Sequence, residues 1–139
     1  MHGLFLDANV LFSAAYREDA PLRRLWNQPG VELVTSAYAL LEAERHLEAE
    51  QRTWLRGRMR GVRLVPDAPS HELPTTALLR DKDVPILAAA IAARATHLIT
   101  GDRRDFGAYY GKRLGGLLVL PPRDYFERPK RKARRSHKS

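Results

Sequence analysis

The stretch that decides the fold runs from Asp83 to Asp102 and reads DVPILAAAIAARATHLITGD. Its first half predicts a helix over residues 84–93, because it is almost wholly apolar and Ala-rich, and Asp83 stands where it can cap that helix. Its second half predicts a short buried strand at residues 97–99, which ends in Thr100-Gly101-Asp102. A helix that leads directly into a buried strand is typical of α/β proteins.

The same alternation extends to both sides of this stretch. Four more short apolar runs predict strands at residues 3–6, 31–34, 62–65 and 117–120. Helical segments are predicted around residues 10–16, 21–26, 36–50, 51–59 and 70–80. Short apolar strands that alternate with helices form parallel sheets covered on both faces. We therefore predict a three-layer α/β/α sandwich around a mostly parallel, five-stranded sheet.

The length and composition favour one cytoplasmic domain. The chain has 139 residues, which suits a single core, and we expect a folded domain over residues 1–127 and a disordered basic tail over residues 128–139. It has no cysteine, which excludes disulfides and thiolate metal sites and fits the reducing cytoplasm. The longest mainly apolar run, residues 85–93, is too short to span a bilayer, so no membrane association is expected.

The net charge of +8 is concentrated in the tail. The tail has no acid and seven basic residues: Arg128, Lys130, Arg131, Lys132, Arg134, Arg135 and Lys138. The rest of the chain carries 17 basic and 16 acidic residues and is nearly neutral. Such a tail either attracts a phosphate backbone or only increases solubility, and charge alone does not decide between these. A second basic cluster at residues 52–63 is more often a solvated helix face than a binding surface.

Three acids stand at informative places along the predicted sheet. Asp7 and Asp102 each follow a predicted strand, and Asp83 opens the helix that leads into one. In parallel α/β sheets, ligands bind at the carboxyl ends of the strands, near the point where the strand order reverses. Each acid alone fits a helix cap or a turn. If the three meet in one crevice, however, their charges repel each other unless a cation neutralises them.

The candidate chemistry is that of a divalent metal ion. Oxygen ligands, without cysteine or clustered histidines, select Mg²⁺ or Mn²⁺ over Zn²⁺. Such an ion activates water and stabilises charge on a phosphodiester. The sequence has no Gly-rich phosphate loop and no G-x-S-x-G motif for a serine nucleophile, and its five histidines are scattered. Metal-dependent carboxylate chemistry therefore remains.

Four segments resemble the PIN-domain family. Residues 6–10, LDANV, are similar to its opening D-x-N-V motif, and residues 83–102 to its later block of an acid, an Ala-rich helix and a strand ending in T-G-D. Residues 105–106 resemble the D-F that follows, and residues 118–126 the last strand and its exit. The similarity covers residues 3 to about 127 in order. It implies a PIN-like fold and a Mg²⁺- or Mn²⁺-dependent ribonuclease.

The resemblance also implies a role for individual residues. Asp7, Asp83 and Asp102 would bind the metal, with Asp105 as an auxiliary catalytic acid. Asn9 and Thr100 would orient ligands or water beside them. Asp81 competes with Asp83, but only Asp83 keeps the register of the family's later block.

One further catalytic acid is harder to assign. PIN domains carry a glutamate on the helix after the second strand, and Glu42, six residues after Ser36, matches that pattern. A helical wheel instead puts Glu44 on the leucine-rich face, where it could be a partly buried, paired acid. We favour Glu42 as the catalytic acid and keep Glu44 as the alternative.

The small, single-domain members of the family are the toxins of VapBC toxin–antitoxin pairs. The resemblance to them implies an RNA substrate, a small antitoxin partner and a homodimer. Arg103 and Arg104, which flank the acids in the sequence, would steer the phosphate backbone toward them, or would simply be solvated turn residues. The alternative function is a PIN-like RNA-binding module with little or no catalysis, acting through its basic tail. A receiver-domain fold fits less well, because it expects a lysine after the last strand, where residues 121–123 read PPR.

Overall fold

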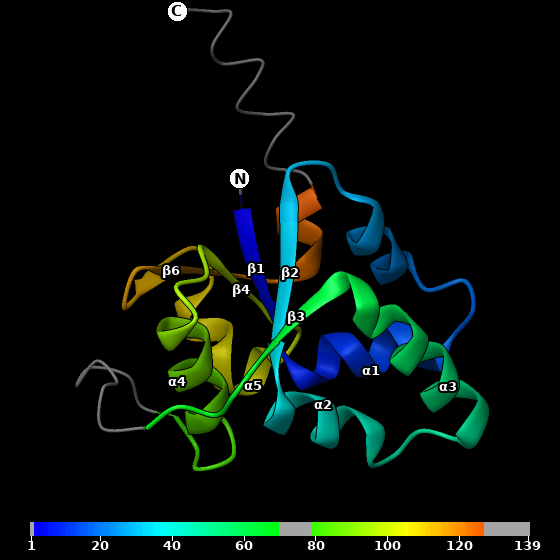
Figure 1. The fold of residues 1–139 in the computed structure, drawn as a ribbon. Coiled ribbons are helices and arrows are strands. Elements are labelled where there is room, and N and C mark those ends of the chain that lie inside the picture. Colours follow the sequence, from blue (N-terminus) through cyan, green and yellow to red (C-terminus); the bar gives the residue numbers. More distant parts are fainter. Residues whose placement is uncertain (1, 70–78, 127–139) are drawn as a thin grey trace, which may run out of the picture.

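A six-stranded sheet forms the centre of the molecule (Figure 1). The structure is a computed structural model and describes residues 2–69 and 79–126. The strand order is β3-β2-β1-β4-β6-β5. The strands are β1 (His2–Leu6), β2 (Val31–Ser36), β3 (Val62–Val65), β4 (His97–Ile99), β5 (Arg113–Leu114) and β6 (Leu117–Leu120).

Five strands run parallel, and they are the five that the sequence predicts. The prediction of five strands is nevertheless one too few, because β5 pairs antiparallel with β6 at the sheet edge. The turn between them contains Gly115 and Gly116, both with positive φ (55° and 88°). Two residues with positive φ close the tight turns that suit the twist of a hairpin, and glycine adopts them without strain.

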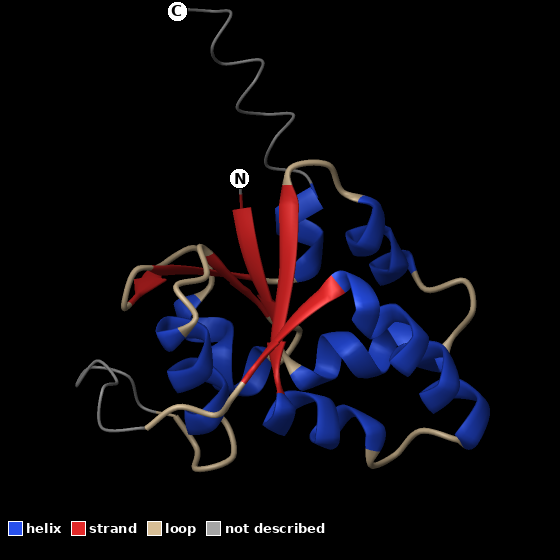
Figure 2. Cartoon of the chain, viewed as in Figure 1, coloured by secondary structure: helices blue, strands red, loops and turns tan. Residues whose placement is uncertain are grey.

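Helices cover both faces of the sheet, as the predicted three-layer sandwich requires (Figure 2). One side carries α1 (Ala8–Tyr16), α2 (Ala37–Glu44) and α3 (Ala49–Arg58), with the 3₁₀ helices η1 (Pro21–Asn27) and η2 (Met59–Gly61). The other side carries α4 (Val84–Ala92), α5 (Arg103–Phe106) and the 3₁₀ helix η4 (Gly107–Tyr109). Right-handed crossovers run in one direction from β1 to β3 and in the opposite direction from β3 to β6, which places the two groups on opposite faces.

The strand order reverses between β1 and β4. From β1 the chain moves outward to β2 and β3, then returns through α4 to β4 on the other side of β1. The carboxyl ends of β1 and β4 are adjacent, because the Asp7 amide donates to the carbonyl of Ile99 at 3.1 Å. A crevice at such a reversal is the usual ligand site of an open α/β sheet.

The core explains why the decisive stretch forms a buried helix and strand. Residues 86–90 of α4 are all buried, and so is the whole of β4. The central residues Leu4, Phe5 and Leu6 of β1 are fully buried as well. A strand buried on both faces appears in the sequence as a continuous apolar run. Such a run locates the strand, but it does not show which side chains point to which face of the sheet.

Two helix predictions need correction. The helix predicted from Ser36 to about Glu50 ends at Glu44, and α3 begins at Ala49. The break is stabilised at Glu48, whose backbone N–H donates to Oε1 of Gln51 at 2.7 Å and so caps the second helix. Residues 21–27 form a 3₁₀ helix in place of an α-helix.

Other predictions fall outside the described residues. Most of the helix predicted at residues 70–80 does so, and residues 79–80 are not helical. The basic tail and the domain boundary at residue 127 also lie outside the described part of the chain. Among the described helices, none is long and apolar enough to cross a membrane.

Candidate active site

Asp7 lies at the end of β1 and is held by three hydrogen bonds. Its Oδ1 accepts from the backbone N–H of Ala8 at 2.6 Å, which makes it the N-cap of α1. Its Oδ2 accepts from Thr100 Oγ1 at 2.7 Å and from Asn9 Nδ2 at 3.2 Å. Burial nevertheless raises the pKa of Asp7, and the nearby charge of Asp102 raises it further against these hydrogen bonds.

Asn9 ties the two strand ends together. Its Nδ2 also donates to Thr100 Oγ1 at 3.3 Å, and its Oδ1 accepts from the backbone N–H of Gly101 at 2.8 Å. A Cβ on Gly101 would lie 3.3 Å from that same oxygen, so a larger residue would push Asn9 away. Thr100 in turn accepts from the backbone N–H of Asp102 at 3.1 Å. Asn9 and Thr100 thus fix Asp7 relative to Asp102.

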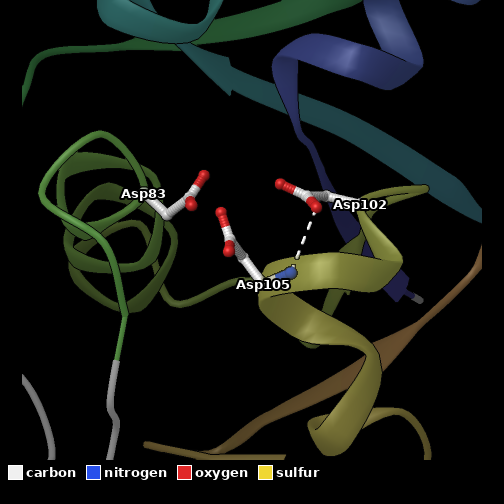
Figure 3. Close-up of side chains that lie close together, drawn as sticks. All are labelled: Asp83, Asp102 and Asp105. Carbon is white, nitrogen blue, oxygen red and sulfur yellow. Dashed lines mark hydrogen bonds between the residues drawn. The ribbon is translucent and has the colours of Figure 1, made fainter.

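Three further acids converge beside Asp7, and their carboxylates point toward one another (Figure 3). Asp83 precedes α4, Asp102 caps α5 by accepting from the Asp105 amide at 3.1 Å, and Asp105 lies in the first turn of α5. One carboxylate oxygen from each lies within 4.8 Å of the others, a spacing that can hold a metal ion. The side chain of Asp83 accepts no capping hydrogen bond from α4, contrary to the sequence prediction; its carboxylate joins the cluster instead.

The cluster is electrostatically unsatisfied. Within the described residues, Oδ2 of Asp83 and Oδ2 of Asp105 are buried and have no hydrogen-bond partner. Burial raises the pKa of Asp83 to about 7, and the neighbouring Asp105 adds to the rise. The pKa of Asp105 is lowered, because a protonated Asp83 can donate to it and because Arg80 and Lys82 lie close. The two carboxyls thus share a proton near neutral pH.

Lys82 supplies the nearest positive charge. Its Nζ lies 3.7 Å from an oxygen of Asp102, 3.7 Å from one of Asp105 and 3.9 Å from one of Asp83. Although partial burial acts to lower it, the pKa of Lys82 is raised by these three carboxylates. Arg80 adds a contact of 3.2 Å between its Nε and Asp105. The three distances from Lys82 exceed ordinary hydrogen-bond length, whereas that from Arg80 does not. Lys82 therefore balances the charge of the acids without a close hydrogen bond to any of them.

A cleft of about 330 Å³ opens onto this centre. Its lining includes Asp7, Asp83 and Asp102 together with Glu42 from α2. Glu44 lies elsewhere: its side chain is 9% exposed, and its two oxygens accept from Arg56 at 2.7 and 3.2 Å. The structure therefore brings Glu42, and not Glu44, to the cleft that the aspartates line.

Three residues of the site were not identified from the sequence. Lys82, Tyr38 and His46 all line the cleft. Tyr38 donates from its hydroxyl to the carbonyl of Lys82 at 2.9 Å and so links α2 to the segment before α4. The triplet Asp81-Lys82-Asp83 was visible in the sequence, but only the fold shows that Lys82 faces the cluster and that the exposed Asp81 does not line the cleft. His46 has no sequence signal of its own.

Comparison with known families identifies the chain. The model of the PIN domain family matches residues 4–104, which span Asp7 and the whole block from Asp83 to Asp102. The chain belongs to the PIN-domain family. PIN domains are generally nucleases that use divalent metal ions. A cluster of acids with unpartnered oxygens, as found in this PIN domain, suits such an ion.

Solved structures agree on the fold. Ten of their chains match this PIN domain. One is a chain of VapBC2 from Rickettsia felis, solved bound to a DNA fragment from their promoter. The two chains share 15% identity and superpose with a TM-score of 0.63, over 86% of this chain and 98% of that one. No match is found among curated protein sequences.

Proposed function

We propose that this PIN domain is a Mg²⁺- or Mn²⁺-dependent endoribonuclease that hydrolyses RNA phosphodiester bonds. The observation that carries the proposal is the meeting of Asp83, Asp102 and Asp105 beside a cleft, with two buried oxygens that lack a partner. Buried carboxylate oxygens without a hydrogen bond destabilise a fold, so a site that keeps two of them is adapted to a cation.

The acids divide into ligands and supporting residues. Asp7, Asp83 and Asp102 are the proposed metal ligands, directly or through water. A bound Mg²⁺ or Mn²⁺ would activate water and offset the charge that develops on the phosphodiester. Asn9 and Thr100 hold Asp7 through its Oδ2, which leaves that carboxylate little freedom to turn away.

Two residues complete the proposed site from its flanks. Asp105 would position a water or a second ion, because it is tied to Asp102 through its own backbone N–H. Glu42 reaches the cleft from α2, where its contact of 3.0 Å with the exposed Arg45 is easily exchanged for a water or a ligand.

The cleft is also the proposed place for the RNA backbone. It is open and lined by both polar and apolar side chains, and the exposed residues Arg103 and Arg104 flank Asp102. Positive charge beside an acidic centre attracts the phosphates that the bound ion would act on. Lys82 lies 55% exposed at the same opening and adds to this attraction.

We further propose that the chain is the toxin of a VapBC-type toxin–antitoxin pair. The membership of the PIN-domain family and the fold likeness to the Rickettsia felis VapBC2 chain support this. The expected partner is a small antitoxin protein, the expected assembly is a homodimer, and the expected compartment is the cytoplasm. Co-expression with the neighbouring small gene, followed by size-exclusion chromatography, would test for a stable complex.

RNA cleavage decides between the enzyme and the alternative of a non-catalytic RNA-binding module. Purified protein should degrade single-stranded RNA in the presence of Mg²⁺ or Mn²⁺, and the cleavage should stop when EDTA is added. The Asp102→Asn variant should be inactive yet melt at a similar or higher temperature, because it relieves repulsion among the acids. Cleavage that persists in EDTA, or in the variant, would contradict the proposal. RNA binding without cleavage by the wild type would favour the alternative.

A further inference from the structure

Three arginines far from the acids lie on aromatic rings. The Cζ of Arg23 is 3.9 Å from the ring centre of Trp54, and that of Arg58 is 5.2 Å from the same ring. The Cζ of Arg24 is 4.4 Å from the ring centre of Phe126. Trp26 meets Trp54 edge-on at 5.8 Å. We call these six residues, Arg23, Arg24, Trp26, Trp54, Arg58 and Phe126, the arginine–aromatic surface.

None of these three arginines forms an ion pair with a described carboxylate. Arg56, in contrast, pairs with Glu44, and Arg63 pairs with Glu32. Arg23 and Arg24 are held instead through Nε, which donates to the carbonyls of Ala14 (2.8 Å) and Pro21 (3.3 Å). Their terminal nitrogens therefore keep donors for an external anion.

The arrangement fits a phosphate backbone. A guanidinium that already lies on a ring loses little freedom when it binds, and its planar donors match phosphate oxygens. Aromatic rings and guanidinium planes also stack on unpaired bases. Three guanidinium groups beside aromatic rings suit a repeating polyanion better than a single small anion.

We propose that the arginine–aromatic surface is a second RNA-binding surface, which holds single-stranded RNA away from the acid cleft. Arg23 contacts α1 at Ala14, near its carboxyl end, whereas the cleft is lined by Ala8 and Phe12 from the first half of that helix. One strand of RNA bound at both places would have to run along α1. The inference rests on the proposed function only in taking RNA as the ligand.

Tryptophan fluorescence tests this surface directly. The chain has two tryptophans, Trp26 and Trp54, and both belong to the surface. Wild-type protein in EDTA, where metal-dependent cleavage is blocked, is titrated with an unlabelled single-stranded oligouridylate. We expect the fluorescence to change and to saturate in parallel with binding measured by anisotropy of a labelled copy. Saturated binding with unchanged tryptophan emission would overturn the proposal.

A matched pair of double variants tests the charges. Arg23→Gln/Arg24→Gln and Lys112→Gln/Arg113→Gln each remove two exposed or half-exposed positive charges, the second pair from β5 and its turn at the far sheet edge. The first variant should bind about tenfold more weakly, and its log–log salt slope should be shallower by about 1.4, at roughly 0.7 per phosphate contact. The second should bind like the wild type. Equal affinities and slopes in the two variants would overturn the proposal.

Failure of the proposed RNA-binding surface can be distinguished from failure of the proposed nuclease function. A protein that binds RNA through this surface but cleaves none with any metal would refute the nuclease and leave the surface standing. A protein that cleaves RNA with full activity after the Arg23→Gln/Arg24→Gln change, and binds it with unchanged affinity, would refute the surface alone. Circular-dichroism melts of both variants ensure that weaker binding does not reflect unfolding.

Discussion

Two groups of buried carboxylates in this protein differ in how their charge is balanced. Glu44, on α2, has a side chain that is 9% exposed and shares two hydrogen bonds with Arg56 from α3. Asp83 and Asp105 are similarly buried, with side chains 6% and 7% exposed, yet each retains an oxygen without a hydrogen-bond partner among the described residues. Glu44 is fully hydrogen-bonded within the chain, whereas the two aspartates have only loose contacts with Lys82 and one contact of Asp105 with Arg80.

The difference separates a structural acid from a candidate ligand. A carboxylate that is paired in the fold contributes to stability, and its removal leaves the partner unbalanced. A carboxylate without a hydrogen bond among other acids lowers the stability of the fold, and it contributes to stability only when a cation binds. Substitutions that neutralise these acids should therefore change the stability of the metal-free protein in opposite directions in the two groups. The following predictions test that contrast.

The largest expected effect is on cleavage. Asp7→Asn, Asp83→Asn and Asp102→Asn should each reduce RNA cleavage by roughly 10²–10³-fold, because each removes charge from the proposed metal site while preserving size. The matched control is Asp81→Asn, two residues before Asp83 and exposed. Initial rates on a labelled RNA, with saturating Mn²⁺, measure the effect. Full activity in any of the three variants would remove that residue from the site.

The second effect separates two glutamates on one helix. Glu42→Gln should lower cleavage by about tenfold to a hundredfold with little change in melting temperature. Glu44→Gln should instead lower the free energy of unfolding by about 1–2 kcal/mol, less than for a fully buried pair because Arg56 is 69% exposed. Urea unfolding and cleavage rates of both variants give the answer. A reversed pattern would make Glu44 the site acid.

The third effect is a dependence of stability on pH. Burial raises the pKa of Asp83 from 3.8 to about 7, so its proton stabilises the metal-free fold fully below about pH 4, and that stabilisation is lost as pH rises from about 4 to about 7. Asp83→Asn removes the loss. In EDTA its melting temperature should exceed that of the wild type by roughly 3–6 °C at pH 8 and by little near pH 4. Asp81→Asn, as the control, should show no such difference, and an equal gain at both pH values would contradict this account.

The smallest effect concerns Lys82, which partly balances the acids in the metal-free protein. Lys82→Met should lower the melting temperature in EDTA and should tighten Mn²⁺ binding about two- to fivefold, because the ammonium no longer competes for the same oxygens. Isothermal titration with Mn²⁺ measures the affinity, and Lys112→Met on the far side of the sheet is the control. Weaker Mn²⁺ binding in Lys82→Met would show that the lysine supports the ion instead.

Most of the fold could be predicted because buried parallel strands leave a simple signal. Five apolar runs gave five strands, and Asp83 to Asp102 gave α4 and β4. The hairpin strand β5 has only two residues, too few for any pattern, although Gly115-Gly116 is a turn signal that could have revealed it. Helix ends were less predictable, since the break between α2 and α3 depends on a cap formed by Gln51.

The site was predictable in part, for a physical reason. Asp7 and Asp102 follow the ends of two adjacent strands, so topology brings them together. The residue type alone also fits caps, and both do cap their helices. The wheel placed Glu44 on the buried face as a paired acid, and Glu44 is indeed buried and bonded to Arg56. Leu41, which the wheel put on the same face, is 65% exposed. Lys82 lies in the segment before α4, where no periodicity indicates the direction of a side chain.

Anomalous diffraction from crystals soaked in Mn²⁺ tests the central claim most directly, because it locates the ion without any assumption about activity. We predict a peak between Asp83 and Asp102, within coordination or one-water reach of Asp7 and Asp105, with Glu42 facing it across the cleft. No comparable peak should lie at Glu44, which remains bonded to Arg56. A cleft that stays free of Mn²⁺ at saturating concentration, or an ion bound at Glu44 while Glu42 faces bulk solvent, would contradict the account.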